Sequence, residues 1–520
     1  MRLGVDVGGT NTDAVLMAGV HVKCSQKTPT TSDISDGIVA AVRAVLDDSR
    51  AAASSIETVM IGTTHFTNAL VERRGLLPVG VIRIALPASS GVEPFAGWPR
   101  DLVAAVRGGV RLVRGGFHVD GRANAALDEL AVRDAARDFK ASGLRSIAIS
   151  GMFAPVNNAM ERRAAEIVRE EIPDAAVTCS YEIGSLGLLE RENAATMNAC
   201  LRALATDVVA SFAKALNDLD IAAPFFISQN DGTLMTADKA EQFPVLTFAS
   251  GPTNSMRGAA YLSGVADALV ADIGGTTTDI GMLVSGFPRE SSVVVDIGGV
   301  RTNFRMPDIL AIGLGGGSLV TADESGWIIG PRSVGYRLTR EARVFGGKTL
   351  TTSDIAVAAG FVDMGDKQLV ADLQANDVEH CVATVRSMVA DGIDRMKTSA
   401  ADVPLVLVGG GAVIIDAHVP GTSNVIVPDN ASVANAVGAS IAQVGAEIDT
   451  VYSYDAIGRE TAMEAAQEAA RQAAIDAGAN AATITITSID EIPLAYVPGG
   501  SVRLRVKAAG DLQTRGARPN

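Results

Sequence analysis

Mostly apolar runs alternate with segments of helical periodicity along most of the chain. Val79–Ala85 and Ser146–Ser150 are short and largely apolar, which is typical of strands buried on both faces of a sheet. Ser35–Asp47 and Met160–Glu171 repeat apolar residues every three or four positions, which predicts amphipathic helices. Strands that alternate with helices favour an α/β fold with largely parallel, buried sheets.

The same patterns predict the remaining elements and a division of the chain into three parts. Further strands are expected at Glu57–Ile61, Ala176–Thr178, Pro224–Ser228 and Leu405–Gly411, and further helices at Ala126–Ser142, Leu188–Leu219, Ser353–Phe361, Asp372–Ser399 and Ala431–Val444. Beyond these, a helix at Arg459–Ala477, a strand at Thr483–Ser488 and a hairpin at Ile492–Val506 predict a small α+β appendage. We expect domains at 1–190, 191–455 and 456–520.

One strand–turn–strand pattern occurs twice. Met1–Leu16 reads MRLGVDVGGTNTDAVL, and Leu269–Leu283 reads LVADIGGTTTDIGML. In each copy an apolar strand ends in Asp, Gly-Gly-Thr-x-Thr-Asp follows, and a second apolar strand begins. The repeat predicts a duplicated nucleotide-binding core with one phosphate-binding turn in each half.

The residue types in these turns suit phosphate. Glycines lack a Cβ, so backbone amides can approach phosphate oxygens, and threonine hydroxyls add donors. The expected nucleotide contacts of the two turns are Gly8, Gly9, Thr10, Asn11, Thr12, Gly274, Gly275, Thr276 and Thr277.

Aspartates flank both turns, and they predict a metal ion. Asp6 and Asp272 end the first strands, where a bare carboxylate would repel a phosphate. A hydrated Mg²⁺ between the two groups removes that repulsion. Asp279 is expected to bind the same ion, whereas Asp13 could either bind it or cap its turn.

Three competing interpretations of the glycine turns fit less well. Two ligand-free hairpins would not need the same eight-residue spacing twice. A dinucleotide fingerprint needs a helix after the turn, but both turns here continue as strands. The nearest match to a Walker A sequence, Ala342–Thr349, lacks the first glycine and a preceding strand, so we expect a loop there.

Composition excludes some classes of binding partner and indicates the cellular compartment. The 520 residues carry a formal net charge of −15, which argues against nucleic acid or an anionic membrane as a partner. The four cysteines show no C-x-x-C spacing, so reduced core thiols are expected. The longest apolar stretch, Val403–Ile415, is too short to span a bilayer. We expect a soluble, cytoplasmic protein.

Two later glycine runs are candidates for completing a nucleotide site between facing hairpins. Gly409, Gly410 and Gly411 follow a buried strand and could let adenosine approach the backbone. Gly315 and Gly316, within the run 313–317, could lie nearer the phosphates or the substrate. Tight packing or a loop accounts equally well for either run when it is taken alone.

At this point the sequence resembles the A-type (ATP-binding) chains of the hydantoinase/oxoprolinase family, within the actin, sugar-kinase and heat-shock chaperone superfamily. The resemblance extends from Met1 to about Ile441. It depends on blocks in a fixed order: Asp6–Asp13, Gly62–Thr64 with Asn68–Arg73, Glu190-Arg191, Gln229–Gly232, Ser250–Pro252, Asp272–Asp279, Gly313–Ser318, Gly330-Pro331 and Thr352–Asp354.

The resemblance implies two actin-like (ribonuclease H-like) lobes around a nucleotide cleft, with ATP and Mg²⁺ as cofactors. It implies ATP-dependent activation of a carbonyl oxygen in a cyclic amide, imide or small ketone, and it allows a B-type partner subunit within an oligomer. Asp6 is then expected on the metal. Asp272 either orients the attacking group and takes its proton or, equally, only organises the metal. Substrate contacts are expected at Thr63, Thr64, His65, Asn68, Glu190 and Asn193.

The chain also departs from the family pattern. Ala412–Ile415 is aliphatic where family members usually carry a Pro-Leu-His stretch, and Asn11 replaces a usual aromatic residue. His65 lies where a substrate-facing group is expected, although a lone histidine is more often structural. These departures indicate an unusual substrate or a second half-reaction on another protein. A small-molecule kinase of the same superfamily and an ATPase that reactivates a partner enzyme are the alternatives to the hydrolase.

Overall fold

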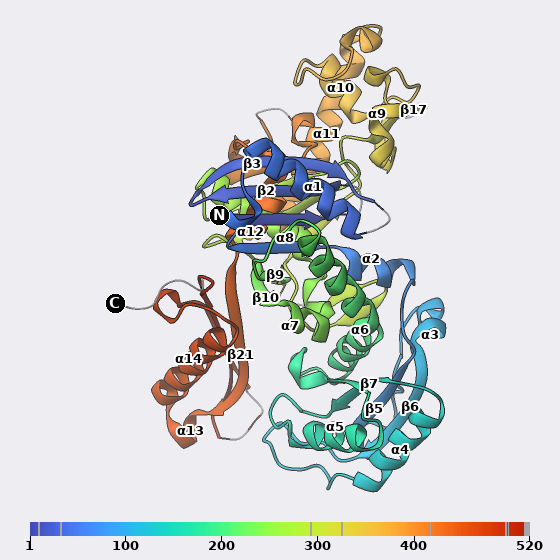
Figure 1. Ribbon diagram of the computed structural model, residues 1–520, viewed down its shortest axis with the longest axis vertical. Helices are drawn as coiled ribbons and strands as arrows, with labels where there is room; N and C mark the ends of the chain where they lie inside the picture. The colour runs from blue at the N-terminus through green and yellow to red at the C-terminus, as the bar shows by residue number, and fades with distance from the viewer. Residues whose placement is uncertain are drawn as a thin grey trace.

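The structure is a computed structural model that describes residues 1–8, 11–31, 34–291, 294–323, 326–415, 418–494, 497 and 499–513. The molecule is elongated, and its central layers lie between two outlying parts (Figure 1). One of these contains α10 (Thr352–Ala358) and α11 (Ala375–Met396), and the other contains β5 (Val79–Leu86) and β7 (Ser146–Gly151).

The first lobe is built on a nine-stranded sheet with the order β22-β23-β21-β10-β9-β4-β1-β2-β3. β1 pairs antiparallel with β2 and parallel with β4, and β4 pairs parallel with β9. The strands are β1 (Arg2–Val7), β2 (Asn11–Ala18), β3 (His21–Pro29), β4 (Thr58–Thr63), β9 (Phe225–Ser228), β10 (Thr233–Thr236), β21 (Gln443–Ser453), β22 (Thr485–Pro493) and β23 (Ser501–Gly510).

The second lobe repeats the central part of that sheet. Its order, β13-β12-β11-β19-β20, matches β3-β2-β1-β4-β9 position by position, and β16 adds to the far side of β12. The strands are β11 (Ala268–Ile273), β12 (Thr278–Val284), β13 (Phe287–Pro288), β16 (Ile309–Ile312), β19 (Val403–Val408) and β20 (Thr422–Ile426). The matching order confirms the expected duplicated, ribonuclease H-like α/β lobes.

Each lobe carries an additional substructure. In the first lobe, β5 to β8 form a separate parallel sheet, and the 30-residue helix α6 (Leu188–Asn217) follows it. Its other elements are β6 (Arg107–Arg114), β8 (Ala176–Cys179), α3 (Arg100–Val106), α4 (Glu129–Ala141) and α5 (Ala159–Glu171). The second lobe carries the hairpins β14 (Val295–Ile297)–β15 (Val300–Thr302) and β17 (Ser318–Asp323)–β18 (Gly326–Ser333), with α9 (Leu338–Glu341). Gly347–Thr349 lies in a loop before α10, as expected.

Two small-residue helices, α8 (Ser250–Ser263) and α12 (Ala434–Ile441), cross in direct backbone contact. A Cβ placed on Gly258 would meet the Ala434 carbonyl oxygen, and one on Gly438 would meet the Asn254 carbonyl oxygen. α8 follows the first-lobe strands but packs on β11 and β19, whereas α12 follows the second-lobe strands but packs on β1 and β4. Each helix therefore joins its own lobe to the sheet of the other.

The C-terminal elements complete the first-lobe sheet. The expected helix and hairpin are present as α14 (Arg459–Asp476) and β22–β23. The helix expected at Ala431–Val444 ends at Ile441, and the long strand β21 then pairs with β10 on one side and β23 on the other. The expected boundaries at residues 190 and 455 do not follow these elements. Residue 190 lies inside α6, and β21 to β23 all belong to the first-lobe sheet. The module is thus an extension of this sheet.

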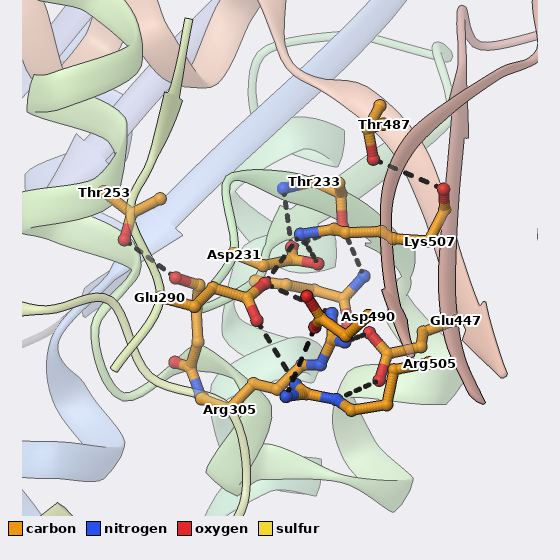
Figure 2. A network of polar contacts seen from close by, with 12 residues as sticks. Asp231, Thr233, Thr253, Glu290, Arg305, Glu447, Thr487, Asp490, Arg505 and Lys507 are labelled. Atoms are coloured by element: carbon orange, nitrogen blue, oxygen red, sulfur yellow. Dashed lines mark hydrogen bonds and ion pairs between the residues drawn. The ribbon is translucent and has the colours of Figure 1, made fainter. Parts of the chain in front are cut away.

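Charged side chains from three parts of the chain form one polar network at this extension (Figure 2). Lys507 on β23 is buried, with its Nζ 2.8 Å from Asp231 Oδ2 and 3.1 Å from Glu290 Oε1. Burial acts to raise the pKa of Asp231, but the charge of Lys507 and its hydrogen bond hold that pKa well below the usual range. The other members are Arg305, Glu447, Asp490 and Arg505.

All four cysteines are buried and unbridged, in agreement with their expected place in the core. Within the described ranges, no helix is both long and apolar enough to cross a bilayer.

Candidate active site

The described residues on either side of the two glycine turns have matching registers and hydrogen bonds. Asp6 lies opposite Asp13 across β1 and β2, and Asp272 lies opposite Asp279 across β11 and β12. The Gly8 amide donates to the Asn11 carbonyl at 3.0 Å, and the Gly274 amide donates to the Thr277 carbonyl at 2.9 Å. Gly9 and Thr10, which were expected to contact nucleotide, lie outside the described residues.

A glycine on the neighbouring parallel strand makes room for each leading aspartate. A Cβ placed on Gly62 would lie 2.2 Å from Asp6 Oδ1, and one on Gly409 would lie 2.3 Å from Asp272 Oδ1. Any larger residue at either position would displace a carboxylate. The duplication thus extends from the turns to the space that holds their acidic groups.

The first aspartate pair is held by a side chain from α12. Asn435 Nδ2 donates to Asp6 Oδ2 at 3.0 Å and to Asp13 Oδ2 at 2.8 Å, and its Oδ1 accepts from the Ala436 amide. Lys27 Nζ lies 2.7 Å from Asp13. The buried Asp6 Oδ1 makes no regular hydrogen bond among the described residues, but Asn254 lies beside it and acts to lower the pKa of Asp6. Oδ2 of Asp6 is therefore fixed by Asn435, and Oδ1 is the oxygen free to bind a cation.

The carboxylates of both turns influence one another electrostatically. Burial, then the charge of Asp13, and more weakly that of Asp272, raise the pKa of Asp6 to about 6. Burial and the charge of Asp272 raise the pKa of Asp279 to about 7. Burial also raises the pKa of Asp272, against a hydrogen bond from Ser255 on α8. Asp272 of the second lobe therefore lies near enough to Asp6 of the first for its charge to act on it, and a cation bound nearby would be stabilised.

These residues fit a hydrated divalent ion better than a bare one. Within the described part of the chain, no three His, Cys, Asp or Glu side chains are grouped to bind a metal directly. Mg²⁺ commonly retains several waters and uses only one or two carboxylates. Asp6 Oδ1, which is free of regular hydrogen bonds among the described residues, and the raised pKa values nearby suit that mode of binding.

The second turn lies against both later glycine runs. The Gly316 amide donates to the Gly274 carbonyl at 3.0 Å, and the Gly411 amide donates to the Ile273 carbonyl at 2.7 Å. A Cβ on Gly315 would lie 2.5 Å from the Thr276 nitrogen. Gly275, Thr276, Thr277 and Gly410 are solvent-exposed, whereas Gly315, Gly316 and Gly411 are buried. All the glycines predicted for the second half of a nucleotide site therefore meet at one place.

One predicted nucleotide contact requires correction. The Thr12 side chain is fully buried, and its hydroxyl pairs with Thr30 at 3.2 Å. The corresponding Thr278 hydroxyl donates to the Leu314 carbonyl at 2.7 Å. Because side chains alternate along a strand, these two threonines point into the protein. They stabilise their turns, and phosphate donors must come from the other turn residues.

Four of the six predicted substrate residues lie together beside the first turn. Thr63 ends β4, and α2 (His65–Glu72) begins two residues later. The Thr64 amide donates to the Val7 carbonyl at 3.3 Å, next to the Gly8 turn. Thr63 Oγ1 lies 2.7 Å from His65 Nδ1, and Asn68 Nδ2 lies 3.4 Å from Thr64 Oγ1.

The other two predicted substrate residues lie at the start of α6. Asn193 accepts a hydrogen bond from Trp98 Nε1 at 2.8 Å and donates to the Arg301 carbonyl at 2.9 Å, so its amide is occupied by protein. Glu190 lies against Gly187. Asn193 thus supports the β14–β15 hairpin, which also accepts a hydrogen bond from Arg73 at Gly298.

Several important side chains were missed by sequence reasoning. Asn435, Asn254 and Ser255 surround the aspartates, although Asn435 and Asp6 are 429 residues apart in the chain. In the sequence these residues stand out only as a few polar positions within helices made mostly of small residues. The sequence also gave no sign that Arg83 on β5 and Glu192 on α6 form a buried pair, in which Arg83 Nε donates to Glu192 Oε2 at 2.7 Å.

Comparison with known proteins agrees with this geometry. The family model for the hydantoinase/oxoprolinase N-terminal region matches residues 2–172, and the hydantoinase/oxoprolinase model matches residues 191–370. The chain is 28% identical to the acetophenone carboxylase gamma subunit of Aromatoleum aromaticum over 69% of this chain and 53% of that one. It is 25% identical to the caprolactamase subunit alpha of Pseudomonas jessenii, over 78% and 61%. The chain thus spans little more than half the length of these relatives.

Solved structures share the fold of this chain. The ATP-dependent caprolactamase from Pseudomonas jessenii aligns with a TM-score of 0.78 at 20% identity, covering 100% of this chain and 89% of that one. Nucleotide-free acetone carboxylase aligns with a TM-score of 0.69 at 19% identity and the same coverage. The order of the motifs, the duplicated lobes and the two family matches lead to one conclusion: the chain belongs to the hydantoinase/oxoprolinase family.

Proposed function

We propose that this protein is an ATP-dependent enzyme that activates the carbonyl group of a small molecule by phosphorylation, and that it opens a cyclic amide or imide by hydrolysis. The observation that supports the proposal is the pair of matching acidic hairpins, one in each lobe, with Asp6 Oδ1 free of regular hydrogen bonds and within reach of the charge of Asp272. The names of the relatives support ATP use and carbonyl activation.

In this proposal ATP supplies the phosphoryl group that makes an unreactive carbonyl electrophilic. The carbonyl oxygen forms a bond to the γ-phosphorus as ADP leaves. Water then adds to the activated carbon, and the ring C–N bond breaks as the nitrogen takes up a proton. A second water hydrolyses the resulting acyl phosphate to the carboxylic acid and inorganic phosphate. Phosphoryl transfer depends mainly on positioning and charge stabilisation, which exposed turn amides and fixed carboxylates provide.

The protein groups have distinct tasks in this scheme. Gly275 presents its backbone to phosphate oxygens without a Cβ in the way, and the exposed Thr276 and Thr277 add hydroxyl donors. Asp6 would hold a hydrated Mg²⁺ that offsets the phosphate charge, and Asn435 fixes Oδ2 of this carboxylate. Asp272 orients the group that attacks or takes its proton, a role for which its raised pKa is suited.

Carboxylation is the second candidate for the step after phosphorylation. Relatives include subunits of acetophenone carboxylase and acetone carboxylase, so an enol phosphate formed from a ketone could accept carbon dioxide instead of water. Relatives named as gamma, alpha and beta subunits favour a multi-subunit enzyme, and we propose a B-type partner for the second half-reaction.

Phosphate release from Mg-ATP tests the proposal. The purified chain is assayed against hydantoins, lactams, oxoproline, ketones and sugars, with and without a candidate B chain. Stimulated phosphate release with ring opening supports the hydrolase, and bicarbonate-dependent release supports carboxylation. A stable phosphorylated product would identify a kinase. Stimulation by a protein alone would identify a partner-directed ATPase and refute the proposal.

A further inference from the structure

His65, beside the first turn, has a hydrogen-bond partner on only one of its two ring nitrogens among the described residues. His65 is half-buried at the start of α2, and its Nδ1 lies 2.7 Å from Thr63 Oγ1. Among the described residues, no hydrogen bond to its Nε2 is present. Burial lowers the pKa of His65 below its usual range, so the imidazole is neutral near pH 7.

The Thr63 hydroxyl decides which ring nitrogen carries the proton. Thr63 Oγ1 already accepts from the His65 backbone amide at 3.3 Å, and the Thr63 side chain is buried. If His65 Nδ1 also donated to this oxygen, the hydroxyl proton would have no acceptor among the described residues. Leaving a buried donor unpaired is costly. The Thr63 hydroxyl therefore donates to Nδ1, and the ring proton lies on Nε2.

The backbone around this pair is held by α8 and by the end of β1. Ser250 at the start of α8 donates through its hydroxyl to the Thr63 carbonyl at 3.0 Å. The Thr64 amide donates to the Val7 carbonyl, one residue before Gly8. Gly62, three residues before His65, lies directly against the Asp6 carboxylate. The imidazole is thus fixed at the carboxyl end of β1 and β4, where ligands of open α/β sheets bind.

We propose that His65 is a neutral hydrogen-bond donor, through Nε2, to an oxygen of the γ-phosphoryl group during its transfer. This inference rests on the proposed function. A donor on the attacking carbonyl oxygen would weaken it as a nucleophile, whereas a donor on the phosphoryl oxygens stabilises the charge that they carry in the transition state. A neutral ring does this without forming an ion pair that would hold the released phosphate.

The difference between two nucleotide affinities tests the contact directly. Calorimetry measures the affinity of the full chain for a non-hydrolysable ATP analogue and for ADP, each in the presence of Mg²⁺. His65→Phe is expected to weaken binding of the analogue about tenfold and to leave binding of ADP unchanged, because only the analogue has a γ-phosphoryl group. His65→Gln, which retains a side-chain N–H donor, is expected to restore most of the difference. His380→Phe on α11 is the matched control.

A second measurement reads the tautomer without nucleotide. In a chain labelled with ¹⁵N-histidine, the signal lost in His65→Gln is expected to report an unprotonated Nδ1 and a protonated Nε2 at neutral pH. Thr63→Val is expected to remove this preference, and Thr63→Ser to retain it. A protonated Nδ1 or a cationic ring would overturn the assignment.

The outcomes separate this inference from the function on which it rests. Equal losses for the analogue and ADP, or unchanged binding of both, would refute the contact with the γ-phosphoryl group while leaving ATP binding intact. Unchanged nucleotide binding with a raised KM for the carbonyl substrate would place His65 on the substrate instead. Absence of nucleotide binding by the unsubstituted protein would refute the inference and the proposed function together.

Discussion

The substitution Gly62→Ala tests directly whether catalysis depends on the position of the Asp6 carboxylate. The new Cβ would lie 2.2 Å from Asp6 Oδ1 and 2.5 Å from Asn254 Nδ2, whereas ordinary contacts begin near 3.4 Å. Asp6 must therefore retreat by about 1 Å, a displacement that can lower an enzymatic rate about a hundredfold. Its charge and sequence neighbours stay the same, so the substitution tests position alone.

The same substitution is expected to lower the free energy of unfolding only modestly. Inserting one methyl group into a packed region costs about 1–3 kcal/mol. Gly62 is not among the glycines with a positive φ, so backbone strain adds nothing. Substrate-stimulated phosphate release gives the rate, and urea unfolding gives the stability. Gly91→Ala, where the new Cβ meets nothing within 4 Å, is the matched control.

Two outcomes would refute this reasoning. A Gly62→Ala protein with the turnover of the unsubstituted enzyme would mean that the position of Asp6 is not critical. A loss of turnover matched by the Gly91→Ala control would mean that the effect is not local.

Three further predictions follow from contacts of the same groups. Asn435→Ala removes the amide between the first-turn carboxylates, so phosphate release should fall about tenfold; unchanged turnover would contradict this. Lys507→Met leaves Asp231 and Glu290 without their shared cation and should lower the free energy of unfolding by about 3 kcal/mol in urea, whereas Lys507→Arg should lose less. Because the pKa of Asp279 is raised from 3.8 to about 7, the folded state binds its proton more tightly, and stability should fall as pH rises through that range. Asp279→Asn should reduce this slope in urea unfolding measured at several pH values, and an unchanged slope would exclude Asp279 as its source.

The sequence predicted features that depend on local pattern. The repeated Asp-x-Gly-Gly-Thr-x-Thr-Asp spacing indicated both hairpins, and the structure gives them matching registers. The Ala-rich periodicity of Arg459–Ala477 predicted α14 almost to its ends. These elements follow from contacts between near neighbours in the chain, which a single sequence records.

Features that depend on distant contacts were missed. Asn435 reaches Asp6 only because α12 packs on the sheet of the other lobe, and nothing near residue 435 encodes that crossing. β21 was expected to be partly helical because small apolar residues continue to Val444, but its pairing with β10 and β23 makes it a strand. Thr12 looked like a phosphate donor until strand alternation turned its hydroxyl toward Thr30.

The place of β21 in the first sheet has a consequence for how the protein forms. β10 pairs with β21, so the sheet begun by β1 cannot be completed until residues 443–510 have been synthesised. Until then, β10 presents an edge with unpaired backbone groups, which is a surface prone to aggregation. The N-terminal lobe is therefore expected to mature late on the ribosome, after the second lobe has all its strands.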